Sequence, residues 1–349
     1  MELKKKKPWK DQRAGFQDSL KYLQGRMKGE IKSLRTPWPK FNDAGTDGIE
    51  WHSTTVIGGR PASGKTLIKD QIIREAFRLN SADDFRVLEF SLEMLARVSA
   101  IREYSAILGK TYKYLCSAEA GVKLTPGDLK SCLEYANTRV KYPIDIIEEP
   151  CTVSEFRLYI QQYMDEHSTK EDGQEEYIED GVKKTRTFQK TVYKKTIITL
   201  DHSLLLKKDA YEKDKYDMLY ALGEALTFLK RRYPIAFIIL SQLNRNIDTP
   251  ERQENGKYGN YILESDIFGA DALLQHADML VGINRPGKQK IQYYGPDRYI
   301  IDNEFILVMH FIKCRNGDTR MSFFKAEFEK MQITEMLTPA TQERKIGTR

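Results

Sequence analysis

Short apolar runs alternate with longer amphipathic segments from Trp51 onward. Each run is four to eight residues long and rich in β-branched side chains, which is typical of buried strands. Because helical segments separate most of these runs, the pattern predicts an α/β fold in which helices flank a mostly parallel, twisted sheet. The predicted strands are 54–57, 87–90, 144–147, 196–200, 235–240, 279–283 and 305–312.

Two amphipathic segments supply long helices that would cover this sheet. One begins near Lys65 and places Ile68, Ile72 and Ala76 on a single face. The other covers 216–231 and has an equally regular apolar face. Its positions that we expect to point inward are Met218, Leu219, Leu222, Ala225, Leu226 and Leu229.

The first 30 residues have a different pattern. A cluster of lysines opens the chain, and Phe16, Leu20, Leu23 and Met27 follow at spacings of three and four. That spacing predicts a helix with one apolar side. We therefore expect a short, basic, helical arm at this end of the chain.

A polar insert at about 167–193 interrupts the alternation after a predicted helix at 153–164. Its centre places Asp180 and Gly181 between an acidic limb and a basic limb. An Asp-Gly pair favours a two-residue hairpin, and opposite charges would face each other across its strands. The simplest interpretation is a solvated hairpin without a separate function.

Composition narrows the class of protein. The apolar share of 40% and the charged share of 30% are those of a globular protein, and no apolar run is long enough to cross a membrane. The four cysteines are scattered, which indicates neither a zinc site nor a disulfide framework. We expect a soluble, cytoplasmic protein with no membrane partner. The net charge of +6, from 56 basic and 50 acidic residues, permits a polyanionic partner without requiring one.

The first predicted strand leads into a glycine-rich turn. Residues 59–66, GRPASGKT, fit the phosphate-binding pattern G-x-x-x-x-G-K-[ST]. Backbone N–H groups in such a turn, and the positive end of the following helix, point at phosphate oxygens. Lys65 would reach the β- and γ-phosphates of ATP, and Thr66 would hold Mg²⁺. The candidate nucleotide-binding residues are Gly59, Arg60, Pro61, Ala62, Ser63, Gly64, Lys65 and Thr66, together with Asp201.

Three polar residues follow predicted strands and extend this site. Asp201 ends the run KKTIITLD and is a candidate Mg²⁺ ligand acting through water. Glu93 follows RVLEF and is a candidate to orient the attacking water. Gln242 follows IAFIIL, at the edge where ligands bind in open α/β sheets. It is either a γ-phosphate sensor or a polar loop residue.

Together these stretches resemble the ATPase domain of DnaB-type replicative DNA helicases, a hexameric RecA-like family. GGRPASGKT is similar to the family's R-P-x-x-G-K-T loop, and FSLEM and SQLNR match two of its motifs without change. ITLDHSLLL resembles its Ile-Asp-Tyr-Leu-x-Leu strand, and KCRNGD resembles its Lys-x-Arg-Asn-Gly-Pro. All five occur in the family's order. The resemblance implies a RecA-like P-loop NTPase domain over 31–335, an arm with a linker-type helix over 1–30 and a tail over 336–349.

The resemblance also implies a role for each matching residue. Those roles are phosphate binding for Lys65, Mg²⁺ binding for Thr66 and Asp201, catalysis for Glu93 and γ-phosphate sensing for Gln242. Lys313 and Arg315 match a pair that reaches the nucleotide of the neighbouring subunit. An arginine used in this way stabilises charge on the transferred phosphoryl group and is worth on the order of 10³ to 10⁵ in rate. Without the resemblance, the two would be surface residues that follow a strand.

The loop with which the family contacts DNA is altered in this chain. The family has Ser-Asp-Leu-Arg-Glu-Ser-Gly-Ala-Ile-Glu-Gln-Asp-Ala-Asp where residues 265–278 have SDIFGADALLQHAD. Phe268 replaces the arginine, and it would either stack on a base, worth roughly 1 to 3 kcal/mol, or pack against a neighbouring loop. The candidate DNA contacts are Arg245, Phe268 and Gly269, with Arg252, Lys257, Tyr258 and Tyr261 close to them in the sequence.

The N-terminal segment is the second feature in which this chain differs from the family. About 50 residues precede the first strand, and the family's N-terminal collar domain does not fit in them. Phe16, Leu20 and Leu23 would contact a neighbouring subunit, as the family's linker helix does, or pack on their own chain. The expected protein is an ATP- and Mg²⁺-dependent ring helicase, a hexamer on single-stranded DNA, with a primase or loader as candidate partner. The alternative is a RecA-like ATPase that remodels or scaffolds a protein or another non-DNA partner.

Overall fold

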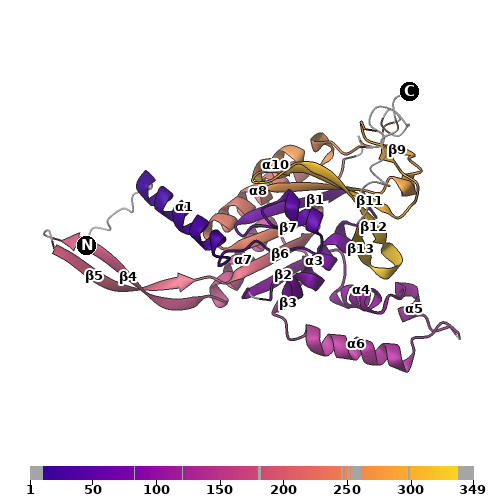
Figure 1. Cartoon of the computed structure of the whole chain (residues 1–349), viewed down its shortest axis with the longest axis horizontal. Helices are drawn as coiled ribbons and strands as arrows, with labels where there is room; N and C mark the ends of the chain where they lie inside the picture. The colour runs from indigo at the N-terminus through magenta and orange to yellow at the C-terminus, as the bar shows by residue number, and fades with distance from the viewer. Residues whose placement is uncertain are drawn as a thin grey trace.

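The computed structural model describes residues 11–336 except 82, 120, 180, 181, 245, 246, 248, 250, 251, 253–260 and 298. Within this part of the chain, nine strands form one sheet in the order β13-β12-β11-β8-β1-β7-β6-β2-β3 (Figure 1). The strands from β8 to β3 are all parallel, and β11, β12 and β13 are antiparallel. The predicted α/β fold with a mostly parallel sheet is therefore confirmed.

The strands of the main sheet have the following bounds. They are β1 (Ser53–Gly59), β2 (Phe85–Ser91), β3 (Ile144–Ile147), β6 (Lys195–Asp201), β7 (Ile235–Gln242), β8 (Met279–Asn284), β11 (Ile306–Cys314), β12 (Arg320–Glu327) and β13 (Gln332–Glu335). A short separate pair consists of β9 (Tyr293–Tyr294) and β10 (Tyr299–Ile300).

Helices cover both faces of the sheet and form two cores. On one face lie α7 (Val153–Glu166), α8 (Lys215–Arg232) and α10 (Ala270–His276), and on the other lie α2 (Pro39–Ala44) and α3 (Lys65–Leu79). Neighbouring strand residues contribute to opposite cores, as Val56 and Ile57 of β1 do. Burial on both faces explains why the strands are continuous apolar runs rather than alternating ones.

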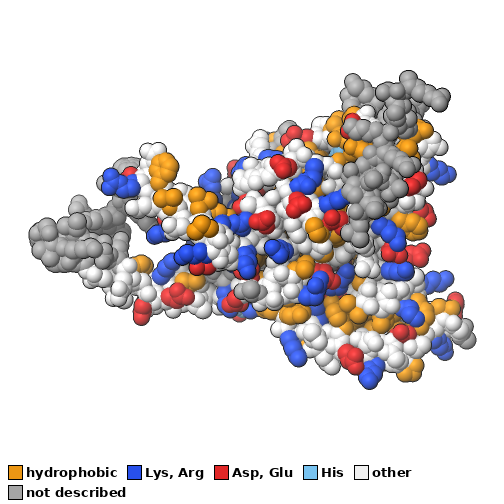
Figure 2. Space-filling model, viewed as in Figure 1, with side chains coloured by type: hydrophobic (Ala, Val, Ile, Leu, Met, Phe, Trp, Pro, Cys, Tyr) orange, Lys and Arg blue, Asp and Glu red, His pale blue; other side chains and the backbone are white. Residues whose placement is uncertain are grey.

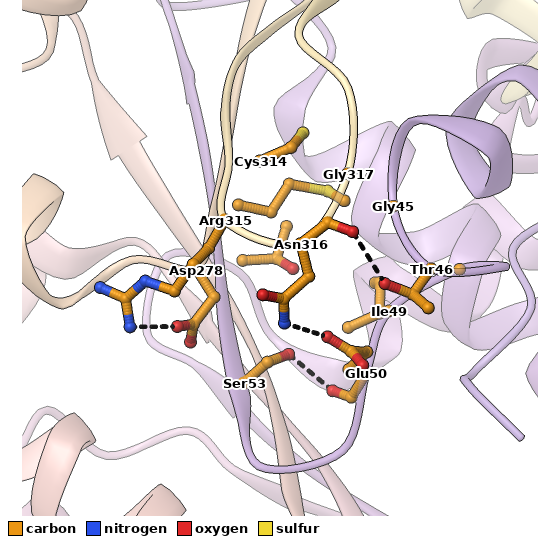
Figure 3. Close-up of a pocket in the computed structure, with 13 residues that line it drawn as sticks. Gly45, Thr46, Ile49, Glu50, Ser53, Asp278, Cys314, Arg315, Asn316 and Gly317 are labelled. Atoms are coloured by element: carbon orange, nitrogen blue, oxygen red, sulfur yellow. Dashed lines mark hydrogen bonds and ion pairs between the residues drawn. The ribbon is translucent and has the colours of Figure 1, made fainter. Parts of the chain in front are cut away.

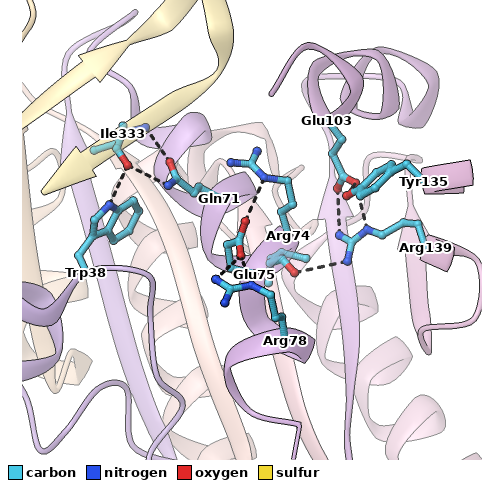
Figure 4. A network of polar contacts seen from close by, with 10 residues as sticks. Trp38, Gln71, Arg74, Glu75, Arg78, Glu103, Tyr135, Arg139 and Ile333 are labelled. Atoms are coloured by element: carbon cyan, nitrogen blue, oxygen red, sulfur yellow. Dashed lines mark hydrogen bonds and ion pairs between the residues drawn. The ribbon is translucent and has the colours of Figure 1, made fainter. Parts of the chain in front are cut away.

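Further helices lie between β2 and β3 and form a lobe beside the sheet (Figure 1). They are α4 (Ala96–Leu108), α5 (Tyr112–Cys116) and α6 (Pro126–Arg139). Arg139 of α6 donates to both carboxylate oxygens of Glu103 on α4, at 3.0 and 2.9 Å, and Tyr135 donates to the same carboxylate at 2.6 Å (Figure 4). This charged contact fixes α6 to α4.

The edge strand β13 is covered by side chains. Gln71 of α3 donates to the carbonyl of Ile333 and accepts from its N–H, both at 2.8 Å, and the indole of Trp38 donates to the same carbonyl at 3.1 Å (Figure 4). A glutamine amide thus satisfies the backbone groups that a further strand would otherwise pair. The edge is closed to strand addition at this residue.

Helix α1 (Gln12–Met27) projects from the body of the molecule (Figure 1). Its apolar residues Phe16, Leu20, Leu23 and Met27 are 63%, 59%, 60% and 80% exposed, and Figure 2 shows hydrophobic side chains gathered along this helix. Its last turns are tied to the body, because Arg26 pairs with Asp47 at 3.2 Å. Within the described part of the chain, the apolar stripe of α1 is left largely exposed.

The polar insert forms a long hairpin that also projects from the body (Figure 1). Strands β4 (Thr169–Glu179) and β5 (Val182–Val192) form a two-stranded sheet of their own. The register sets two acidic positions against basic ones, Glu171 against Lys190 and Glu175 against Arg186, and the other acidic positions of β4 against uncharged residues. The two residues of the predicted turn, Asp180 and Gly181, lie outside the described residues. Among the described helices, none is long and apolar enough to span a membrane.

Candidate nucleotide site and the two edges of the sheet

The loop between β1 and α3 has the backbone geometry of a phosphate cradle. Gly64 precedes α3 with φ at +106°, in the left-handed region that glycine tolerates. A β-carbon at this position would lie 2.9 Å from the Phe328 ring. Strand, turn and helix therefore follow in the order that aims backbone N–H groups at an anion.

Lys65 is folded back over this loop. Its Nζ donates to the carbonyls of Gly59 at 2.8 Å and Arg60 at 2.9 Å. Burial lowers the pKa of its ammonium to about 8, although Asp201 and Glu93 act in the opposite direction. A buried ammonium that has only carbonyls to bond gains strongly from a phosphate placed beside it.

The candidate catalytic side chains gather at the carboxyl edge of the parallel strands. The β1–β7 register places Gln242 beside Gly59, and the β2–β6 register places Ser91 beside Asp201. Glu93 lies two residues past Ser91. The structure thus brings together the phosphate loop, the two carboxylates and the amide, which are far apart in the sequence.

Asp201 is 2% exposed and lies beside Thr66. Burial raises the pKa of its carboxyl, and the Lys69 ammonium and a hydrogen bond from Thr66 oppose that rise. Among the described residues no group of three or more His, Cys, Asp or Glu side chains could hold a metal ion. Mg²⁺ is usually held by one or two carboxylates together with phosphate oxygens and water. The pair Thr66 and Asp201 fits a magnesium ion that arrives with a nucleotide.

Gln242 is held by His202, which sequence reasoning did not single out. The side-chain Nε2 of Gln242 lies 3.0 Å from Nε2 of His202, and Nδ1 of the same imidazole accepts from the Leu204 N–H at 3.2 Å. Because Nδ1 accepts, Nε2 carries the proton in the neutral ring, so the amide must present its oxygen to it. The amide NH₂ is then free to donate toward a phosphate.

Lys65, Glu93 and Gln242 face one pocket of about 410 Å³, a volume within the usual range for small-molecule sites. It is lined by Pro61, Ala62, Gly64, Lys65, Thr66, Leu67, Glu93, Met94, Arg102, His202, Gln242, Arg285, Phe328 and Met331. Arg285 and Phe328, which no sequence pattern indicated, stack with the guanidinium carbon 3.5 Å from the ring centroid. The pocket is large enough for the phosphates of a nucleotide.

Lys313 and Arg315 lie at the opposite, amino edge of the parallel strands. Cys314 at the end of β11 pairs with Met279, which in turn pairs with Thr55 near the start of β1. The phosphate loop begins four residues later at Gly59, about 13 Å along the strand. An arginine side chain cannot bridge that distance within one chain.

The Arg315 guanidinium instead faces Asp278 at 3.0 Å and keeps 54% of its side chain exposed (Figure 3). The hollow beside it, between Glu50, Asn316 and Gly45, holds only about 30 Å³ (Figure 3). That volume admits water but no nucleotide. Lys313 donates to the carbonyl of Leu274, and burial lowers the pKa of its ammonium.

Residues 34–334 match the model of the DnaB-like helicase C terminal domain. The chain belongs to that family. Two curated relatives, both the replicative DNA helicase DnaB of Helicobacter pylori strains, are 23% identical over 263 and 256 residues. These matches cover 75% and 73% of this chain but 46% and 44% of the relatives, so the chain spans about half the length of the relatives it matches.

Two solved structures share the fold of this DnaB-like domain. One, of a DnaB-like replicative helicase and its interactions with primase, has a TM-score of 0.68 at 16% identity and covers 88% of this chain and 64% of that one. The other, of an ATPase domain, has a TM-score of 0.70 at 16% identity and covers 92% of this chain and 98% of that one. At this identity the likeness shows the RecA-like fold.

The altered loop of this DnaB-like chain packs on its own body. Phe268 is half-buried against the core of α8 and α10 and stacks on Tyr216. Gly269 adopts φ at +65° before α10, where a β-carbon would lie 2.3 Å from Leu219. Arg245, the third predicted DNA contact, lies outside the described residues, as do Lys257 and Tyr258.

Proposed function

We propose that this chain is the motor domain of an ATP-driven ring helicase that moves along single-stranded DNA and separates duplex strands during replication. Its membership of the DnaB-like helicase C-terminal family supports this function, as do the curated relatives, which are replicative helicases. The observation that carries the proposal is the separation of the site into two halves. The phosphate cradle lies at one edge of the sheet and Arg315 at the other.

Two chains are needed to complete such a site. A contact between different surfaces of two identical chains repeats around an axis and gives a ring when the rotation closes, or an open helical filament when it does not. The exposed apolar stripe of α1 supplies a second surface for the same neighbour. We propose a homo-oligomeric ring, a hexamer as in the family, with single-stranded DNA in its channel and a primase or a loader as further partner.

Each residue of the cradle has a defined task in ATP hydrolysis. Lys65 turns from its loop carbonyls to the β- and γ-phosphates, and Glu93 accepts a proton from the attacking water. Gln242 donates to the γ-phosphate through the NH₂ that His202 leaves free. Arg315 of the next chain, with Lys313 beside it, stabilises the charge that develops on the transferred group. Mg²⁺, held by Thr66 and through water by Asp201, would neutralise phosphate charge.

A combined ATPase and unwinding assay tests this function. Wild-type protein should hydrolyse ATP faster when single-stranded DNA is added, displace a labelled strand from a forked duplex, and bind DNA less tightly as salt rises. Lys65→Ala should abolish both hydrolysis and strand displacement. Assembled wild-type protein that shows neither DNA stimulation nor strand displacement would overturn the proposal. The family description and the curated relatives give no support to the remodelling alternative.

A further inference from the structure

The altered loop is joined directly to the residue that faces the nucleotide. The backbone N–H of Phe268 donates to the carbonyl of Gln242 at 2.9 Å, and Leu243 pairs with Ile267 in an antiparallel bridge. Phe268 therefore follows any displacement of the end of β7. Its side chain is half-buried on the core of α8 and α10, so its own ring is not the surface that a ligand would meet.

The ring that solvent does meet belongs to Tyr216, at the start of α8. Its centroid lies 5.3 Å from that of Phe268 with an interplanar angle of 27°, so one side of the ring rests on Phe268. The residue is nevertheless 53% exposed. Tyr220, one turn further along α8, is 44% exposed. The phenylalanine thus supports a solvent-facing aromatic ring.

Charge on this surface does not favour a phosphate backbone. Residues 207–217 carry four lysines and four acidic residues, which cancel. Lys215 turns toward the body of the molecule and donates to the carbonyl of Leu204 at 3.3 Å. A stacking ring, in contrast, contacts the face of a base rather than a phosphate, and every base offers such a face. The chemistry of the surface is that of base stacking.

We propose that Tyr216, supported by Phe268, is the surface on which a base of single-stranded DNA stacks in this chain. The inference rests on the proposed function and names how the DNA is held. It replaces a contact to the DNA backbone with a contact to a base. It also connects the two ligands. The nucleotide would contact the side chain of Gln242, whose backbone carbonyl accepts a hydrogen bond from Phe268, and the base would stack on Tyr216, which rests on Phe268.

Binding of two oligonucleotides tests the inference. One is a fluorescently labelled oligothymidylate and the other is an abasic strand of the same length, both titrated at fixed low salt with a non-hydrolysable ATP analogue. Tyr216→Ala should weaken binding of oligothymidylate by about 5- to 100-fold, and Tyr216→Phe should retain most of it. Wild-type protein and Tyr216→Ala should bind the abasic strand equally, because no base is present to stack.

Two further variants make the result decisive. Tyr159→Ala, which removes an exposed tyrosine from α7, should bind both strands as the wild type does. Tyr216→Leu keeps apolar contact with Phe268 while removing the aromatic face. It should weaken oligothymidylate binding as much as Tyr216→Ala is expected to, and it keeps the test valid if the alanine variant unfolds. The inference is overturned if Tyr216→Ala or Tyr216→Leu binds oligothymidylate like the wild type, or if the loss is as large on the abasic strand. Wild-type protein that binds neither strand would contradict the proposed function itself.

Discussion

Arg315 and Asp278 form a 3.0 Å ion pair at the amino edge of the sheet, and the backbone N–H of Arg315 donates to the carbonyl of the same aspartate at 2.8 Å. Asp278 also pairs with Lys230 of α8. The aspartate therefore holds both the backbone and the guanidinium of an arginine whose side chain remains half-exposed. Because an exposed ion pair of this kind contributes little to stability, the guanidinium can leave Asp278 for a phosphate of a neighbouring chain at small cost.

We expect Arg315→Ala to reduce ATP hydrolysis by about 10³- to 10⁵-fold while nucleotide binding persists. Arg315→Lys should also be impaired, because lysine lacks the planar fork of donors. A mixture of two inactive variants tests the trans position of the arginine more directly. Equal amounts of Lys65→Ala and Arg315→Ala protein should recover hydrolysis at interfaces where an intact cradle meets an intact arginine. Full turnover by Arg315→Ala alone would disprove the assignment.

His202→Phe should weaken the coupling between DNA and hydrolysis. The substitution keeps an aromatic ring but removes the hydrogen bonds to Gln242 and to the Leu204 backbone. Because one such bond is worth about 0.5 to 1.5 kcal/mol, DNA stimulation of the ATPase should fall by about 2- to 10-fold. The measurement is the ratio of rates with and without oligonucleotide, with His167→Phe, directly after α7, as control. An unchanged ratio would show that His202 does not orient the amide.

Leu20→Lys should oppose assembly without destabilising the monomer. Leu20 is 59% exposed in the single chain, so a charge there costs little until a neighbour covers it. Burial of a leucine contributes about 1.5 to 3 kcal/mol, and assembly should shift to roughly 10- to 100-fold higher protein concentration. Analytical ultracentrifugation with an ATP analogue measures the shift. Ala14→Lys, on the opposite side of α1, should assemble normally, and equal behaviour of the two variants would exclude α1 as a contact.

His310 should make stability depend on pH. This side chain is 3% exposed, and burial lowers the pKa of its imidazole from 6.5 to about 4. Above pH 6.5 both folded and unfolded forms are neutral, and between 6.5 and 4 only the unfolded form gains the proton. The free energy of unfolding should therefore fall by about 3 kcal/mol over that window. Denaturant unfolding of His310→Gln, compared with the wild type across the same pH values, should lack this component. Parallel pH curves would contradict the expectation.

The sheet was predictable because each buried strand is a continuous apolar run. The β7 residues Ile235 to Leu240 all belong to the cores, and α8 buries every inward position that its spacing indicated. The helices α4 to α6 were not predicted, since several of their apolar residues, such as Leu129 and Leu133, remain half-exposed. A helix that packs on a small lobe has a less regular apolar face than one that packs on a sheet. Strands β12 and β13 were missed because polar residues interrupt them.

The candidate site was predictable where its residues follow a known sequence spacing, and not where their positions depend on side-chain packing. The phosphate loop, Asp201 and Glu93 each follow a strand, so topology alone brings them to one edge. Sequence could not show that Phe268 would be covered by Tyr216, because 52 positions separate the two residues. The pairing of His202 with Gln242 was hidden for the same reason. Such contacts depend on side-chain geometry across neighbouring elements.

The distance between Gly59 and Arg315 has a consequence for the free chain. In the proposed mechanism a single chain would hold ATP in its cradle, but Arg315, which would speed hydrolysis, cannot reach the cradle of its own chain. Newly synthesised, unassembled chains would therefore bind ATP without hydrolysing it. The rate of ATP hydrolysis per chain would rise with protein concentration and level off when every chain has two neighbours. In an incomplete ring, the nucleotide site at one end would have no neighbouring arginine and would stay inactive. ATP hydrolysis would then begin when the chains assemble and not when each chain is synthesised.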